Sequence, residues 1–166
     1  MRAETARLLH AMADYDRDPA LVHHFTKVHG FASAIGVMEG LDAETQFILE
    51  TAALVHDIGI RNAERTYGRS DGKLQEQIGP GEAEALLRSL GDYTEAQIDR
   101  VKYLVGHHHT YTNVEGMDYR ILIEADFLVN LYEFVDRYKA ILAAERHIFR
   151  TESGKKLLHS IFGEMQ

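Results

Sequence analysis

A chain of 166 residues, 45% hydrophobic and 27% charged, is long enough for one globular domain with a substantial core. Its formal net charge of −8 argues against binding to nucleic acids or anionic membranes. The lack of cysteine excludes disulfides and thiolate metal ligands, so any metal must be held by His, Asp, Glu and water. We expect a cytoplasmic protein, because no apolar run approaches the ~18–20 residues of a membrane span and the N-terminus lacks the apolar segment of a secretory signal.

The first part of the chain predicts two helices. Residues 2 to about 13 carry a modest apolar stripe, and Asp18 before Pro19 is typical of the start of a second helix. That helix is expected to end near Glu39, because Gly40 follows it. Its apolar positions recur at steps of three and four residues, and one histidine lies among them. The inward face comprises Leu21, His24, Val28, Ala32, Ile35 and Met38.

Asp42 is the predicted cap of a third helix, which runs into His56-Asp57. From Ile60 to Gly79 several glycines break the periodicity, and we interpret this segment as a loop with at most a short turn of helix. A loop of this length within a small domain is usually functional. Pro80 then opens a helix that reaches residue 90.

Thr94 and Gln97 match a capping box and begin a helix that ends at residue 106. After a polar connection over 110–116, Asp118 is the predicted cap of a helix that carries Asp126 within its apolar stretch. Two further helices are expected at about 136–150 and 152–162. Because no strand alternation or internal repeat is present, we predict an all-α, single-domain helical bundle over residues 1–166. Its core is expected at about 19–133, followed by C-terminal helices at about 136–162.

Six imidazole and carboxylate side chains lie on a core-facing stripe, at a helix end or inside an apolar run. A polar group buried there without a partner costs roughly 2–7 kcal/mol. Helical bundles build metal sites by directing such residues inward from several helices. A mixed set of this kind suits a divalent transition metal such as Mn, Fe, Zn, Ni or Co. The six are His24, His56, Asp57, His107, His108 and Asp126.

Each of these residues also has an ordinary structural interpretation. His24 could be a hydrogen-bonded core histidine, and Asp126 could form an ion pair with an arginine. The run of His107, His108 and His109 could be a solvated helix terminus, an explanation that suits His109 best. Several accidental placements of this kind are improbable together, which favours the metal site.

The spacing of His24, His56-Asp57 and Asp126 resembles the H…HD…D signature of the HD-domain superfamily of metal-dependent phosphohydrolases. The segment from His24 to Val28, with Ala32, is similar to the superfamily's histidine helix, and Ala52 to Gly59 closely matches its central motif. The resemblance extends over roughly Pro19 to Glu133. It implies an all-α fold and a metal held by His24, His56, Asp57 and Asp126.

In relatives with two metals, paired histidines that resemble His107 and His108 hold the second ion. Those relatives also have a histidine near the start of the helix that here is predicted to begin at Pro80. This chain has Ile78 to Glu82 there, without histidine. We therefore expect one tightly bound metal, and whether a second ion binds is left open.

The resemblance implies a hydrolase of phosphate esters or anhydrides that acts on a nucleotide or another small phosphorylated metabolite, with a metal-activated water as nucleophile. Asp57 would bind the metal and orient the water, while His107 and His108 would contact substrate oxygens or transfer protons. The segment after Asp57 supplies positive charge suited to phosphate. The residues assigned to substrate binding are Arg61, Arg65, Lys73 and Glu82.

Two other functions stay open at this point. The superfamily includes oxygenases that use iron at the same ligands, and the chain could also be a non-catalytic regulatory or binding module. The arginines and Lys73 could equally be solvated charges. The expected partner is a small phosphorylated substrate rather than a membrane or a nucleic acid, and a homodimer stays open.

Overall fold

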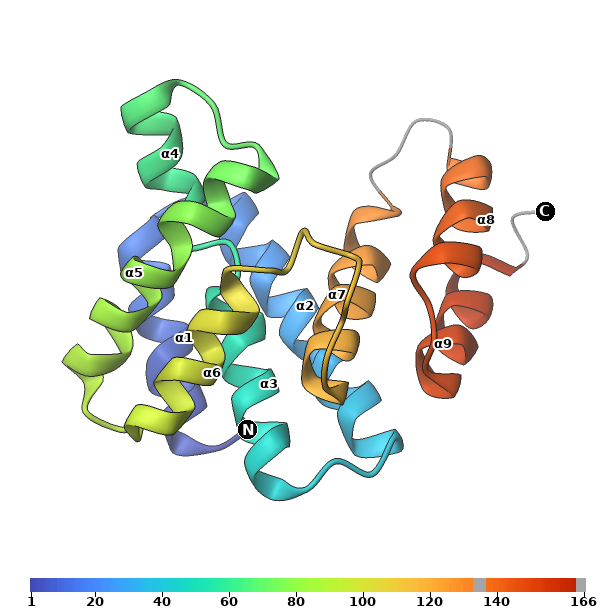
Figure 1. The fold of residues 1–166 in the computed structure, drawn as a ribbon, viewed down its shortest axis with the longest axis horizontal. Helices are drawn as coiled ribbons and strands as arrows, with labels where there is room; N and C mark the ends of the chain where they lie inside the picture. The colour runs from blue at the N-terminus through green and yellow to red at the C-terminus, as the bar shows by residue number, and fades with distance from the viewer. Residues whose placement is uncertain (133–136, 164–166) are drawn as a thin grey trace.

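Nine helices make up the secondary structure of the residues that the computed structural model describes, 1–132 and 137–163 (Figure 1). These residues contain no strand, so the predicted all-α single domain is confirmed. In chain order the helices are α1 (Ala3–Asp16), α2 (Pro19–Met38), α3 (Ala43–Val55), α4 (Ile60–Tyr67), α5 (Gly72–Leu90), α6 (Glu95–Val105), α7 (Met117–Asn130), α8 (Arg137–His147) and α9 (Glu152–Phe162).

Side-chain caps confirm the predicted helix starts at residues 18, 42 and 94. Asp18 accepts a hydrogen bond from the backbone of the first turn of α2 and leaves Pro19 at the first helical position. Asp42 accepts two backbone hydrogen bonds from the first turn of α3. Thr94 and Gln97 form the capping box of α6. Because the loss of one such cap costs about 0.5–2 kcal/mol, these residues determine where the helices begin.

Helix α3 is the centre of the fold and packs against α1, α2, α6 and α7. Its C-terminal part is buried on every side, as expected of a helix that is apolar around its circumference. Burying one large aliphatic side chain stabilises the fold by roughly 1.5–3 kcal/mol, so this helix anchors its neighbours. The buried residues are Leu49, Ala52, Ala53, Leu54 and Val55, each at most 1% exposed.

The segment from Ile60 to Gly79 is helical, and its prediction as a loop is wrong. Helix α4 occupies its first part, and α5 begins at Gly72, so that Pro80 lies inside α5 rather than at its start. Asp71 caps α5 by accepting a hydrogen bond from Leu74 N (3.3 Å). Gly68, at φ +66°, ends α4. Gly79 serves helix packing, because a Cβ there would lie 2.7 Å from Val105 Cγ1.

The predicted inward face of α2 is correct in its middle and wrong at its end. Val28, Ala32 and Ile35 are fully buried, whereas Met38 is 53% exposed. The last turn of α2 leads into the exposed corner at Gly40, so Met38 stays in contact with solvent.

Asp118 does not cap α7, contrary to the prediction. Gly116, at φ +96°, occupies the cap position, and Asp118 lies buried in the first turn. Arg100 of α6 donates to both of its carboxylate oxygens, at 2.7 and 2.8 Å. A buried carboxylate requires such a partner, so this ion pair ties α7 to α6.

Helices α8 and α9 lie on one side of the domain, next to α7 (orange to red in Figure 1). The buried carboxylate of Glu124 in α7 holds their connection by accepting hydrogen bonds from Arg150 N (2.6 Å), Thr151 N (2.9 Å) and Thr151 Oγ1 (2.5 Å). Helix α8 ends at His147, three residues short of the prediction, and the predicted start at residue 136 lies outside the described residues. No helix in the described part of the chain has both the length and the apolar character needed to cross a membrane.

Candidate metal centre

Three helices of the core bring the predicted metal ligands together. His24 lies on the face of α2 that packs against α3 and α7, His56 ends α3, Asp57 follows it directly, and Asp126 lies in the second half of α7. His56 is fully buried and Asp126 is 5% exposed. The centre is therefore built where α2, α3 and α7 pack together, with Asp57 in the turn that directly follows α3.

The ligand atoms of these residues lie at nearly uniform separations. His24 Nε2 is 3.3 Å from His56 Nε2, and each of these nitrogens is 3.3 Å from Asp57 Oδ2. Asp126 Oδ1 is 3.2 Å from His24 Nε2 and 3.6 Å from His56 Nε2. Within the described residues, His24, His56 and Asp57 form one group that could hold a metal ion.

These separations fit a transition metal. Ligands at the usual metal–ligand bond lengths of about 2.0–2.2 Å lie roughly 2.8–3.6 Å apart when they are adjacent in a tetrahedron or an octahedron. His56 Nδ1 donates to the carbonyl oxygen of Ala53 (3.0 Å), which fixes the tautomer and leaves the Nε2 lone pair directed into the centre. Asn130 Nδ2 donates to Asp126 Oδ1 (2.9 Å) and orients that carboxylate.

The electrostatics of the centre favour bound positive charge. Burial alone would lower the pKa of His56, but the carboxylates of Asp57 and Asp126 raise it well above its ordinary value. Burial would raise the pKa of Asp57 and Asp126, yet the surrounding imidazoles hold both well below the ordinary value. The two carboxylates are thus stable as anions in a buried place, which is the state that a cation requires.

A second group shares Asp57. Within the described residues, Asp57, His108 and His109 also have ligand atoms close enough to hold a metal ion. His108 Nδ1 donates to Val105 O (2.7 Å), and its buried Nε2 lies 3.4 Å from Asp57 Oδ1 without a hydrogen bond of ordinary geometry. His109 Nε2 lies 3.0 Å from Gln75 Oε1. An unpartnered buried nitrogen beside a carboxylate is a place for a water molecule or a cation.

His107 lies apart from both groups. Its ring stacks on Tyr103 with 4.2 Å between centroids, and its Nδ1 donates to Tyr103 O (2.7 Å). The turn after α6 thus directs the first of the three histidines toward aromatic side chains and the next two toward Asp57. Sequence reasoning missed His109, because consecutive residues in a turn follow no periodic pattern.

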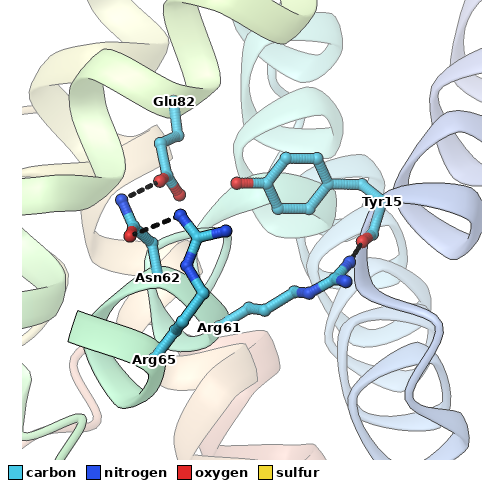
Figure 2. A pocket seen from close by; sticks show the side chains of 5 residues that line it. All are labelled: Tyr15, Arg61, Asn62, Arg65 and Glu82. Carbon is cyan, nitrogen blue, oxygen red and sulfur yellow. Dashed lines mark hydrogen bonds between the residues drawn. The ribbon is translucent and has the colours of Figure 1, made fainter.

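A pocket of about 250 Å³ collects three of the four residues assigned to substrate binding (Figure 2). It is lined by Tyr15 of α1, Arg61, Asn62 and Arg65 of α4, and Glu82 of α5. Lys73 is exposed and does not line the pocket. Tyr15 and Asn62 were not expected, although a helical interpretation of 60–67 would have placed Asn62 and Arg65 on one face by their spacing of three residues.

A close approach of two glycines connects the pocket to the metal centre. A Cβ at Gly59 would lie 2.9 Å from the backbone nitrogen of Gly79, and a Cβ at Gly79 would lie 2.7 Å from Val105 Cγ1, so neither position has room for a side chain. This contact brings α5 against the corner that follows Asp57. One turn further along each helix, Asn62 Nδ2 donates to Glu82 Oε1 at 2.7 Å.

The pKa of Asp16 is shifted by residues of the metal centre and of the pocket. Burial raises the pKa of Asp16 to about 6, Arg61 opposes this shift, and Asp57 and Glu82 add to it. Asp16 follows Tyr15 at the end of α1, so the end of this helix lies within electrostatic range of the centre and of the pocket.

No model of a known protein family matches the chain, and neither the characterised proteins nor the solved structures contain a significant match. Its chemistry must therefore be inferred from the centre and the pocket themselves.

Proposed function

We propose that this protein is a metal-dependent phosphohydrolase of the HD-domain type that acts on a nucleotide or another small phosphorylated metabolite. The observation that carries the proposal is a pair of imidazole nitrogens, His24 Nε2 and His56 Nε2, that lie 3.3 Å apart and each 3.2–3.6 Å from one carboxylate oxygen of Asp57 and one of Asp126. Its residues are those that resemble the H…HD…D signature. The adjacent pocket with two guanidinium groups supports a phosphorylated substrate.

His24, His56, Asp57 and Asp126 would hold the metal. A divalent cation bound there supplies a Lewis acid that lowers the pKa of water and polarises a phosphoryl oxygen. The packed helices hold the four side chains in place before the ion arrives, and hydrogen bonds from His56 to Ala53 and from Asn130 to Asp126 restrict two of them further.

Asp57 and His108 would position and deprotonate the attacking water. Asp57 Oδ2 faces His24 and His56, while Oδ1 faces His108 Nε2 at 3.4 Å. Asp57 Oδ1 and His108 Nε2 can each accept a hydrogen bond. For the imidazole this follows because its hydrogen is on Nδ1, which donates to Val105 O. A water that donates to both would be oriented by the carboxylate, and the imidazole could take its proton.

One tightly bound metal suits this arrangement. The group of Asp57, His108 and His109 offers a second position, but Gln75 Oε1 already contacts His109 Nε2. Burial, followed by the neighbouring His108, lowers the pKa of His109 to about 4, so the imidazole is neutral at pH 7 and Gln75 accepts its hydrogen when Nε2 carries it.

The oxygenase alternative uses the same ligands and differs in what the pocket must bind. Two guanidinium groups beside the centre favour a phosphate over an uncharged substrate. The complete ligand set argues against a purely regulatory module. Burying two imidazoles and two carboxylates costs free energy, and a module without catalysis would not need them.

The test is a substrate screen with purified protein. The protein is stripped with EDTA and reconstituted separately with Mn, Fe, Zn, Ni and Co, then assayed for phosphate release from a panel of nucleotides and phosphate esters. Metal-dependent release, abolished in Asp126→Asn, is expected. Oxygen consumption by the iron form without phosphate release would establish the oxygenase instead, and neither reaction in any metal form would refute an enzymatic function.

A further inference from the structure

The pocket between α1, α4 and α5 contains arginines that are free to bind an anion. In the described part of the chain, Arg7, Arg69, Arg88 and Arg100 all form ion pairs with carboxylates, whereas Arg61 and Arg65 form none. Arg61 donates to the backbone oxygen of Tyr15, and Arg65 donates to Asn62 Oδ1 at 3.3 Å. These bonds orient the two guanidinium groups, neither of which forms an ion pair with a carboxylate, although Asp16 lies within electrostatic range of Arg61.

The same pocket contains an acceptor that requires a donor. Glu82 Oε1 is bound to Asn62, whereas Glu82 Oε2 is buried and forms no hydrogen bond of ordinary geometry among the described residues. The Tyr15 hydroxyl lies near this carboxylate, and after burial their interaction helps to raise the pKa of Tyr15 to about 12. A buried carboxylate oxygen in this state is destabilising, because its lost contact with water is not replaced by a hydrogen bond. A bare phosphate dianion has no hydrogen to offer it, whereas a hydroxyl group next to the phosphate does.

Tyr15, which forms the remaining wall, and the size of the pocket are both suited to a ligand with one small ring. The Tyr15 ring forms part of the pocket wall beside the two arginines, and its hydroxyl points toward Glu82 (Figure 2). The volume of about 250 Å³ exceeds the needs of a phosphate ion and lies below the roughly 300–1,000 Å³ of pockets for drug-sized ligands. One apolar face, two cationic groups and one unpaired acceptor match a phosphorylated sugar.

We propose that this pocket binds the phosphorylated sugar end of the substrate, with Arg61 and Arg65 on the phosphate and Glu82 on a sugar hydroxyl. The proposal rests on the proposed function, of which it specifies the substrate class: sugar phosphates, including the ribose 5-phosphate end of nucleotides. Tyr15 covers the sugar ring, and Asn62 holds Glu82 and Arg65 in their relative positions.

The experiment measures binding without turnover. Calorimetric titrations of ribose 5-phosphate, inorganic phosphate and ribose are made on EDTA-treated protein, in which hydrolysis does not occur. We expect ribose 5-phosphate to bind at least about tenfold more tightly than either other probe, because it alone satisfies both the arginines and Glu82.

Three variants separate the contacts. Arg65→Ala should weaken ribose 5-phosphate and inorganic phosphate about ten- to hundredfold, as expected for a lost charge-assisted hydrogen bond. Glu82→Ala should weaken ribose 5-phosphate by about tenfold and leave inorganic phosphate bound as well or better, since a negative charge is removed. Arg69→Ala is the matched control, because Arg69 pairs with Asp71 outside the pocket. Circular dichroism and thermal unfolding confirm that each variant is folded.

The outcomes distinguish this proposal from the proposed function. Equal affinities for ribose 5-phosphate and inorganic phosphate, or identical effects of Arg65→Ala and Arg69→Ala, overturn the pocket assignment. Metal-dependent hydrolysis that survives unchanged in Arg65→Ala and Glu82→Ala does the same and leaves the hydrolase intact. Binding that depends on Arg65 and Glu82 without hydrolysis in any metal form supports the pocket and refutes the hydrolase.

Discussion

Asp57 Oδ1 lies 3.4 Å from the buried Nε2 of His108, while the other oxygen of the same carboxylate faces His24 and His56. One side chain at the end of α3 thus joins the predicted metal ligands of α2 and α3 to the turn that follows α6. The two oxygens of Asp57 have different surroundings, which allows this residue to hold a metal and to orient a water molecule at once.

Removal of one ligand should empty the centre. We expect His56→Ala and Asp57→Ala to contain less than about a tenth of the metal of the unmodified protein after dialysis, because each residue contacts the other ligand groups directly. Metal content is measured by plasma mass spectrometry. His10→Ala is the control, since His10 is exposed on α1 and pairs only with Asp14. Unchanged metal in both ligand variants would refute the assignment.

The centre should retain one equivalent of metal. His109 is held by Gln75, so His109→Ala is expected to leave the tightly bound ion in place. Dialysis followed by metal analysis of both proteins measures this. Two equivalents in the unmodified protein, reduced to one in His109→Ala, would contradict the expectation and identify Asp57, His108 and His109 as a second metal site.

His108 and His107 should differ sharply in their contribution to catalysis. His108→Ala should lower kcat by about 10²-fold or more with metal content retained, in the range typical of general acid–base groups. His107→Ala should lower kcat much less, because its ring is occupied by Tyr103. Steady-state kinetics on the best substrate of the panel measure both values. Equal losses in the two variants would show that the turn after α6 rearranges when substrate binds.

Glu50 should stabilise the fold in a pH-dependent way. The contact with His29, followed by hydrogen bonds from Gln46 and Ser33, lowers its pKa to about 2 against the effect of burial. Because the pKa in the folded state lies below the unfolded value of 4.5, the stabilisation is complete above pH 4.5. It is lost as the pH falls toward 2.

Glu50→Gln should therefore lower the free energy of unfolding by about 1–3 kcal/mol at pH 7 and by much less at pH 2.5. Urea unfolding at the two pH values measures the difference. Glu115→Gln, at an exposed position, controls for the removal of one negative charge. A loss that is equal at both pH values would mean that packing rather than charge accounts for the effect.

The contact between Gly59 and Gly79 should tolerate no side chain. Gly59→Ala places a Cβ 2.9 Å from the backbone nitrogen of Gly79, so we expect a loss of about 1–3 kcal/mol in the free energy of unfolding. Gly81→Ala adds a methyl group to α5, the helix that contains Gly79, at a position where a Cβ would have no atom within 4 Å. That variant should be more stable by roughly 0.5–1 kcal/mol. Chemical denaturation of the two variants measures the change in the free energy of unfolding for each. Destabilisation of equal size in both would refute the packing argument.

The local sequence was sufficient to identify the helices that carry the predicted metal ligands and the inward direction of those side chains. His24 follows the apolar repeat of α2, His56-Asp57 ends a helix that is apolar on all sides, and Asp126 lies inside an apolar run. A helical repeat determines which face is buried, and a buried polar residue on that face needs a partner. These are properties of a few consecutive turns, so they can be predicted without the fold.

Only the tertiary structure decided which of the three consecutive histidines reach Asp57, and which residues line the pocket. In the turn after α6 a change of one position redirects a side chain, so His108 and His109 join the centre and His107 does not. The pocket unites α1, α4 and α5, of which α4 and α5 approach closely because Gly59 and Gly79 have no side chains. The sequence shows those glycines as interruptions, and their role depends on a contact between residues 20 positions apart.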